Sequence, residues 1–360
     1  MKYEIEFFGI DEDTRDADAI CFRYFDEKIQ RFVVCVYDGG TIDYGNALVE
    51  HLKKFYFSGE ANPRIDYVIC SHSDQDHSSG LSILFDHFRI GKLIMNRPWL
   101  YVDELFDRVS DERITKNSLA DRFREAYPFV YKLEEKAKQN QVAIETGFQG
   151  KKIGNALTIL SPSKAFYLDL IVESEKPKIA KSFSESLTLG RLIESIKGRF
   201  ESWRTELLRE NVSTTSENET SIIILGEMGS DQFILTGDSG IRALNQAIDF
   251  ASDRSFNVKD TLLYQVPHHG GRHNVSPSLL NRLLGPIVAD GERTKRMAIV
   301  SVGKNSDHPR KMVVNAFLRR GVPVYAARGK TLLYQKGTPP RDGYYPEREL
   351  DFCREVEEWQ

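Results

Sequence analysis

The chain has 360 residues, of which 41% are apolar and 28% are charged, the proportions of an ordinary globular protein. Its formal net charge of −4 excludes a chain coated in basic residues, and with it a global attraction to nucleic acid or anionic lipid. No apolar stretch approaches the roughly 18 residues of a membrane span, and the acidic start does not resemble a secretory signal. The four cysteines lack CxxC spacing, so we expect reduced thiols in a cytoplasmic protein without membrane contact.

The first third of the chain predicts short strands around one helix. Ala19–Phe25 and Phe32–Tyr37 are rich in β-branched and aromatic residues, and the second ends at the turn signal Asp38-Gly39-Gly40. Gly45–Phe57 has apolar residues at helical spacing. Ile65–Cys70 predicts a buried strand, and the polar segment SHSDQDHSSG follows it directly. This alternation predicts an α/β fold, in which active sites gather beyond the carboxyl ends of strands.

The middle of the chain predicts more helix. Pro98 suits the first turn of one helix, and residues 118–140 predict another that Pro128 interrupts. Strand character returns at Ala156–Leu160, and Leu189–Leu208 repeats apolar residues every three or four positions, as an amphipathic helix does. We interpret residues 97–150 and 165–220 as helical insertions in a single domain of residues 1–335, with an extension at 336–360.

The last third returns to strands that end in polar residues. Segments 221–225 and 232–236 predict a hairpin that ends in Gly237-Asp238, and a helix is expected near Arg242–Ala251. A strand at Thr261–Val266 ends in Pro267-His268-His269, and a strand at Met297–Val302 leads to His308.

Metal-binding residue types therefore follow four predicted strands. Five of the eight histidines lie there, together with Asp238: His72, His77, His268, His269 and His308. The segment His72-Ser73-Asp74-Gln75-Asp76-His77 holds four potential ligands, too many for one ion, and two ions about 3.5–4 Å apart would relieve the crowding. Asp238 could then bridge the two ions. The alternative is a polar loop whose Asp and Ser residues cap a helix.

In combination, Asp38-Gly39-Gly40, HSDQDH, LTGD and PHHGG resemble the metallo-β-lactamase fold superfamily, and most closely the metallo-β-lactamase-like domain of ComEC-type competence proteins. The resemblance implies an α/β four-layer αββα sandwich with helical insertions. It also implies that His72 and Asp74 bind a first metal, that Asp76 and His77 bind a second, and that Asp238 bridges. Asp74 replaces the usual second histidine of the motif.

Two ligand assignments stay open under this resemblance. The third histidine of the first site is missing from residues 217–221, so that metal is held more weakly or an oxygen ligand such as Asn218 substitutes. The last ligand of the second site is His268, His269 or His308.

The ligand types also predict the chemistry. Replacing imidazole by carboxylate makes the site harder, so we expect two divalent ions, Zn²⁺ or Mn²⁺. Asp76 is the candidate that orients a nucleophilic water, and His268 or His269 is the candidate that stabilises the transition state or protonates the leaving group.

A basic stretch begins beside His308. Residues 303–330 hold seven basic side chains: Lys304, Arg310, Lys311, Arg319, Arg320, Arg328 and Lys330. A positive surface beside a metal centre suits nucleic acid or another phosphate-bearing substrate, with Lys304 and Arg310 as the predicted contacts. A chance surplus of surface charge is the alternative.

Three functions fit these features. The favoured one is a metal-dependent phosphodiesterase or nuclease. The second is a metallohydrolase of an ester, lactone, thioester or amide, because a fold does not fix the substrate. The third is a metal-binding protein without catalytic activity, whose helical insertions bind a protein partner or a second copy of the chain.

Overall fold

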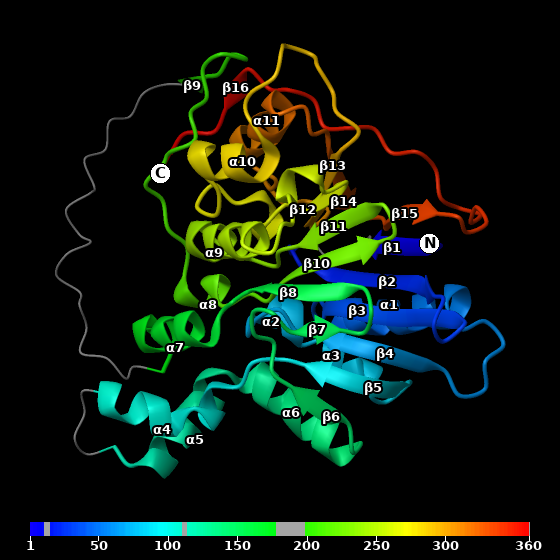
Figure 1. Cartoon of the computed structure of the whole chain (residues 1–360), viewed down its shortest axis with the longest axis vertical. Coiled ribbons are helices and arrows are strands. Elements are labelled where there is room, and N and C mark those ends of the chain that lie inside the picture. The colour runs from blue at the N-terminus through cyan, green and yellow to red at the C-terminus, as the bar shows by residue number, and fades with distance from the viewer. Residues whose placement is uncertain (11–14, 110–113, 178–198, 360) are drawn as a thin grey trace.

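The computed structural model describes residues 1–10, 15–109, 114–177 and 199–359. Within these ranges the strands form two seven-stranded sheets and one two-stranded sheet. Figure 1 shows α9 (Ile241–Ser252), α10 (Pro277–Leu284) and α11 (Lys311–Arg319) in the upper half of the view, and α4 (Val102–Leu105), α5 (Lys116–Ala126) and α6 (Pro128–Gln139) in the lower half.

The first sheet has the strand order β15-β1-β2-β3-β4-β5-β6. Its strands are β1 (Tyr3–Phe7), β2 (Ala19–Asp26), β3 (Arg31–Gly39), β4 (Arg64–Ile69), β5 (Arg89–Ile94), β6 (Ala143–Glu145) and β15 (Leu332–Lys336). The strands from β15 to β3 pair antiparallel and those from β3 to β6 pair parallel. The predicted strands β2, β3 and β4 are confirmed, whereas β1 and β15 were not predicted.

The second sheet has the order β14-β13-β12-β11-β10-β8-β7. Its strands are β7 (Lys152–Ile153), β8 (Leu157–Ser161), β10 (Ile223–Met228), β11 (Asp231–Leu235), β12 (Leu263–Gln265), β13 (Met297–Val302) and β14 (Val324–Arg328). The predicted hairpin is confirmed as β10 and β11, which pair antiparallel. Strands β11 to β14 run parallel, so their carboxyl ends lie at one edge.

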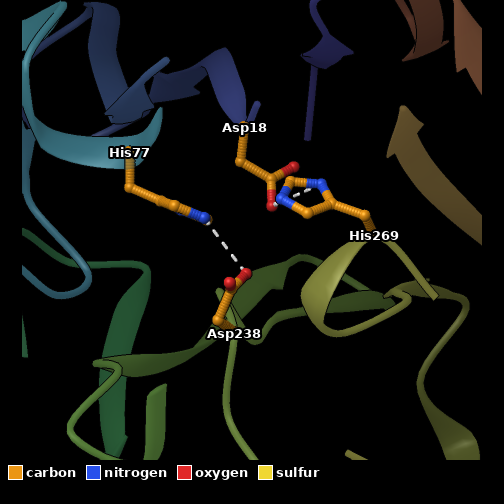
Figure 2. A group of neighbouring side chains, drawn as sticks. All are labelled: Asp18, His77, Asp238 and His269. Atoms are coloured by element: carbon orange, nitrogen blue, oxygen red, sulfur yellow. Dashed lines mark ion pairs between the residues drawn. The ribbon is translucent and has the colours of Figure 1, made fainter. Parts of the chain in front are cut away.

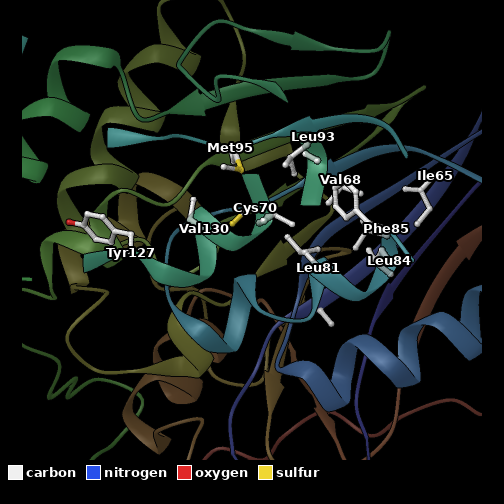
Figure 3. Close-up of a cluster of buried hydrophobic side chains, with 14 of the residues drawn as sticks. Ile65, Val68, Cys70, Leu81, Leu84, Phe85, Leu93, Met95, Tyr127 and Val130 are labelled. Carbon is white, nitrogen blue, oxygen red and sulfur yellow. The ribbon is translucent and has the colours of Figure 1, made fainter. Parts of the chain in front are cut away.

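Three apolar clusters define the layers. One lies between the first sheet and its helices α1 (Ile42–Phe55), α3 (Leu81–Leu84), α5 (Lys116–Ala126) and α6 (Pro128–Gln139), and Figure 3 shows the part around Val68, Leu84 and Leu93. A second lies between the second sheet and α9 (Ile241–Ser252), α10 (Pro277–Leu284) and α11 (Lys311–Arg319). The third joins residues of both sheets, among them Phe22 and Phe233. The described chain is therefore an α/β sandwich, with helices outside two facing sheets.

Shorter helical elements complete the connections. They are α2 (Gln75–Ser78), α4 (Val102–Leu105), α7 (Lys164–Glu173), α8 (Ser216–Glu219) and 3₁₀ turns at Pro98–Leu100, Phe106–Arg108, Val258–Asp260 and His268–Gly270. Cys21, Cys35 and Cys70 are buried free thiols, as predicted, and Cys353 is partly exposed. In the described residues, no helix has both the length and the apolar character needed to cross a bilayer.

The predicted helix at Leu189–Leu208 is wrong over its last ten residues, and its remainder lies outside the described residues. Arg199–Phe200 forms β9, which pairs with β16 (Glu355–Val356), and Ser202 forms a bridge with Thr205. The fully buried Arg319 side chain explains the difference, because it donates to the backbone carbonyls of Ser202, Trp203 and Thr205. A helix would keep carbonyls for its own hydrogen bonds. The predicted domain boundary at residue 335 stays a prediction.

Candidate metal centre

Backbone contacts fix the segment that follows β4. Asp18 N donates to Asp76 O (3.1 Å), Gly40 N donates to Asp18 O (2.8 Å) and Gly80 N donates to Gly40 O (2.9 Å). A Cβ on Gly80 would lie 2.0 Å from the carbonyl oxygen of Gly39, so only glycine permits this approach. The HSDQDH segment is therefore held against the end of β3.

Asp38 orients His77 directly and His72 through Ser71. Its fully buried carboxylate accepts from Ser71 N (2.7 Å), Ser71 Oγ (2.6 Å) and His77 Nδ1 (2.9 Å). Because Ser71 gives its only hydroxyl proton to Asp38, its oxygen accepts from His72 Nδ1 at 2.9 Å. In their neutral forms both imidazoles therefore carry the free lone pair on Nε2, as metal-binding histidines do.

Residues that follow strands of the second sheet form the opposite side of the site. Asp238 follows β11, and Gln265 Oε1 fixes the turn before it by accepting from Thr236 N (2.8 Å) and Gly237 N (3.0 Å). His268 and His269 follow β12 with φ of 49° and 54°, left-handed values that cost energy outside glycine and often mark functional sites. His269 Nδ1 donates to Ser301 O (2.9 Å), which again leaves Nε2 free.

These side chains form two groups that share Asp238. In the first, His72 Nε2 lies 3.9 Å from Asp74 Oδ2 and 4.0 Å from Asp238 Oδ2, and His268 Nδ1 contacts that same Asp238 oxygen.

In the second, His77 Nε2 lies 3.1 Å from Asp238 Oδ1 and 3.9 Å from Asp76 Oδ2, which is 3.5 Å from His269 Nε2. Figure 2 shows the core of the second group, where one donor atom each of Asp18, His77, Asp238 and His269 lies within 4.8 Å of the others.

Several of these atoms are buried without a hydrogen-bond partner. They are Nε2 of His72, His77 and His269, Oδ1 of Asp238 and both carboxylate oxygens of Asp18. Each such atom costs about 1–3 kcal/mol if it stays unpaired. Divalent cations bound in the two groups would coordinate these lone pairs, so the residues fit a metal site with mixed nitrogen and oxygen ligands.

The electrostatics of the second group also favour a cation. Burial alone would lower the pKa of His77, but the carboxylates of Asp238 and Asp76 raise it well above its usual value. The pKa of His269 is raised to about 10 despite burial, mainly by Asp76 and Asp18. Burial raises the pKa of Asp18, and the nearby positive charge of His269 and His77 offsets this effect only in part. The carboxylates thus attract positive charge, either protons on the histidines or metal ions.

Asp18 was not predicted from the sequence. The predicted ligands all follow strands, whereas Asp18 precedes β2. Because β2 runs antiparallel to β3 and Ala19 pairs with Gly39, the residue before β2 lies at the same edge as the end of β3. That pairing is the signal that could have identified it.

The structure places the other predicted residues less centrally. His308 Nδ1 lies 2.7 Å from Asp16 Oδ2, and neither group around Asp238 includes His308. The Asn218 side-chain nitrogen donates to Thr214 Oγ1 (2.7 Å) and lies 3.1 Å from His268 Nδ1. Asn218 thus turns its side-chain nitrogen toward His268, and His268 is the residue that contacts Asp238 in the first group.

The basic stretch is not one positive surface, which corrects that expectation. Arg319 and Arg320 are fully buried, where they pair with Glu201 and Glu206. Arg328 donates to the carbonyl oxygens of residues 303, 304, 306 and 308, and Lys330 pairs with Glu347. Arg310 pairs with Asp307 at 2.6 Å, and its backbone N donates to Gly270 O (3.1 Å), one residue after His269. Of the two predicted contacts, Arg310 thus lies beside the metal-centre loop.

Comparison with known proteins identifies no family: no family model matches the chain, and no curated protein matches it. Among similar solved structures is the CmlA beta-hydroxylase E377D mutant, with 10% sequence identity and a TM-score of 0.43. The match covers 93% of this chain and 54% of that one, so the chain spans about half of its length. Similarity at this level carries no argument about function. The chain is, at the level of class, an α/β sandwich with a buried His/Asp cluster suited to metal.

Proposed function

We propose that the chain is a metallo-β-lactamase-like, metal-dependent hydrolase that acts on phosphodiesters. One observation carries the proposal: buried, unpartnered nitrogen and oxygen atoms from both sheets converge on Asp238. Their order along the chain, HxDxDH followed by Asp238 and the His268-His269 pair, supports the superfamily assignment.

The ligand sets follow from the two groups. His72, Asp74 and His268 would hold one ion and Asp18, Asp76, His77 and His269 the other, with Asp238 between them. Divalent ions bound there would lower the pKa of water toward neutrality and neutralise negative charge on the substrate.

The solvent exposure of the side chains distinguishes the roles of His269, Asp76 and His268. The His269 side chain is 4% exposed, which suits a ligand, whereas the side chains of Asp76 and His268 are 36% and 33% exposed. Asp76 is therefore accessible to a nucleophilic water, which it would orient through its carboxylate. His268 turns Nδ1 toward Asp238 and is the histidine of the pair that a substrate can reach, so we assign the predicted contact with the leaving group to its other ring nitrogen.

Arg310 supports a phosphate-bearing substrate. Its side chain is 24% exposed and its backbone N is bonded to Gly270, so its guanidinium can contact a phosphate that flanks the reacting one. Lys304 stays the second predicted contact.

A substrate panel tests this function. Protein loaded with Zn²⁺ or Mn²⁺ is assayed on single- and double-stranded DNA, RNA, bis(p-nitrophenyl) phosphate, a lactone and a thioester. We expect turnover of the phosphodiesters and its loss in Asp238→Asn, which retains the side-chain shape. Turnover of the lactone or thioester alone would reject phosphodiesters as substrates, and inactivity on every substrate would reject a hydrolase.

A further inference from the structure

Lys176 lies at the outer face of the first ligand group. Its Nζ is 2.6 Å from Asp74 Oδ1, while Asp74 Oδ2 is the oxygen that faces His72 Nε2. The two oxygens of one carboxylate therefore point to different partners. Asp74 can use Oδ2 as a ligand and keep its contact with Lys176 through Oδ1.

A buried anchor fixes the backbone of Lys176. Its amide N donates to Ser174 Oγ (3.2 Å), which itself donates to Glu217 and accepts from Tyr127 (3.1 Å). Ser174 and Glu217 are 4% and 6% exposed. A small cavity lined by His72, Ser73, Ser174 and Glu217 lies between this anchor and the first ligand group.

Stability alone does not account for this arrangement. The side chains of Lys176 and Asp74 are 44% and 30% exposed, and ion pairs this accessible contribute only about 0–1 kcal/mol. The chain nevertheless holds an ammonium group against a candidate ligand, with almost half of the side chain open to solvent. Such a cation can donate to an oxyanion that approaches the centre.

We propose that Lys176 binds an anionic oxygen of the substrate, of the kind that a phosphoryl group carries, at the mouth of the first ligand group. Asp74 keeps the ammonium in place, and Lys176 keeps Oδ2 of Asp74 turned inward. The proposal rests on the proposed function, and it assigns a specificity residue that the motifs do not contain.

Binding of orthophosphate to Mn²⁺-loaded protein tests the assignment. Isothermal titration calorimetry compares the wild type with Lys176→Met, which keeps the aliphatic stem, and Lys176→Arg, which keeps the charge. Lys336→Met is the matched control, because Lys336 also pairs with a carboxylate at 2.6 Å (Asp231) and is half exposed, but lies on β15. The Mn²⁺ content of each protein is measured by mass spectrometry.

We expect Lys176→Met to retain its manganese and to bind phosphate about tenfold more weakly, as the loss of one charged hydrogen bond predicts. Lys176→Arg should recover most of the affinity, and Lys336→Met should equal the wild type. Unchanged phosphate affinity in Lys176→Met, or tighter manganese binding without a loss of phosphate affinity, would overturn the role of Lys176 and leave the proposed function intact. A wild type that binds manganese but no phosphate would also overturn the role of Lys176, whereas only the substrate panel can reject the proposed function.

Discussion

Asp18 is the residue whose environment most clearly calls for a bound cation. Both carboxylate oxygens are buried without a hydrogen-bond partner, and burial raises the pKa of the group. Asp18→Asn removes the charge at nearly constant volume. We expect it to lower the affinity for one of the two ions by at least about tenfold. Loss of a residue that only orients a metal ligand typically lowers metal affinity about 10–100-fold, and loss of a ligand itself should cost no less.

Asp16→Asn is the control for this variant. Asp16 lies two residues earlier, and its carboxylate accepts from Gly303 N (2.9 Å) and Ser306 Oγ (2.8 Å) and contacts His308. Metal titration of both variants, followed by mass spectrometry, should show a loss in Asp18→Asn alone. Two tightly bound ions in Asp18→Asn would exclude Asp18 as a ligand.

Asp38 acts on the centre through other residues. In Asp38→Asn an NH₂ group replaces one carboxylate oxygen, so it faces either the Ser71 backbone N–H or the two donors Ser71 Oγ and His77 Nδ1. Loss of such an outer partner typically costs about 10–100-fold in metal affinity, and we expect that range here. Calorimetric titration with Zn²⁺ measures it. An unchanged dissociation constant would mean that His77 is oriented by its packing alone.

The sequence predicted most of the residues around Asp238, because strand ends followed by His or Asp are local patterns. His72, Asp74, Asp76, His77, His268 and His269 all lie in the two groups. Asp18 and the contact between Lys176 and Asp74 depend on pairing between distant segments. No local pattern carries that information, so both required the structure.

At the scale of elements, the segment after β15 is tied to β1 by buried charges. Arg341 Nη1 donates to Glu6 Oε1 (2.6 Å), Tyr344 donates to Glu6 Oε2 (2.6 Å) and His51 Nε2 lies 2.9 Å from the same oxygen. Burial alone would raise the pKa of Glu6, but the hydrogen bond and charge of His51 and the charge of Arg341 lower it from 4.5 to about 2.

This lowered pKa predicts a loss of stability in acid. A carboxyl group whose pKa falls on folding stabilises the protein above its unfolded pKa, and this contribution disappears as the pH falls from about 4.5 toward 2. The shift corresponds to about 3 kcal/mol. Urea unfolding at pH 5, 4 and 3 should show a smaller acid loss for Glu6→Gln than for the wild type. Glu60→Gln, at an exposed loop position, is the control, and equal slopes for all three proteins would contradict the prediction.

Strands were easier to predict than the helix at Leu189–Leu208. The cores of β2, β3 and β4 are continuous apolar runs that are buried on the sheet, so local composition decides them. Residues 199–208 have helical spacing, but Arg319 takes their carbonyl groups and β16 pairs with β9. Tertiary contacts outweigh a weak intrinsic preference in that segment.

At the scale of the whole molecule, the candidate centre lies across the junction of the two sheets. Asp18, His72 and His77 lie at the edge of the first sheet, and Asp238 and His269 at the edge of the second. Two direct contacts already join the sheets there: Tyr37 Oη donates to Ile222 O (2.8 Å), and Ile222 N donates to Ser71 O (2.9 Å). The pattern of strand ends alone predicted one edge of a sheet, whereas the resemblance to the metallo-β-lactamase fold implied a site along the shared edge of two sheets.

Metal binding should therefore stabilise the whole fold rather than one loop, because the same ions would contact both sheets. A ligand that binds only the folded state adds RT ln(1 + [L]/Kd), about 2.7 kcal/mol at a hundredfold excess over Kd. We expect Zn²⁺ or Mn²⁺ to raise the midpoint of thermal unfolding by several degrees as one cooperative transition, and EDTA to reverse it. In Asp238→Asn this increase should vanish, whereas Asp231→Asn, at the opposite end of β11, should keep it. Differential scanning calorimetry distinguishes this from local binding, for which metal would shift only part of the transition and leave the remaining unfolding at its metal-free temperature.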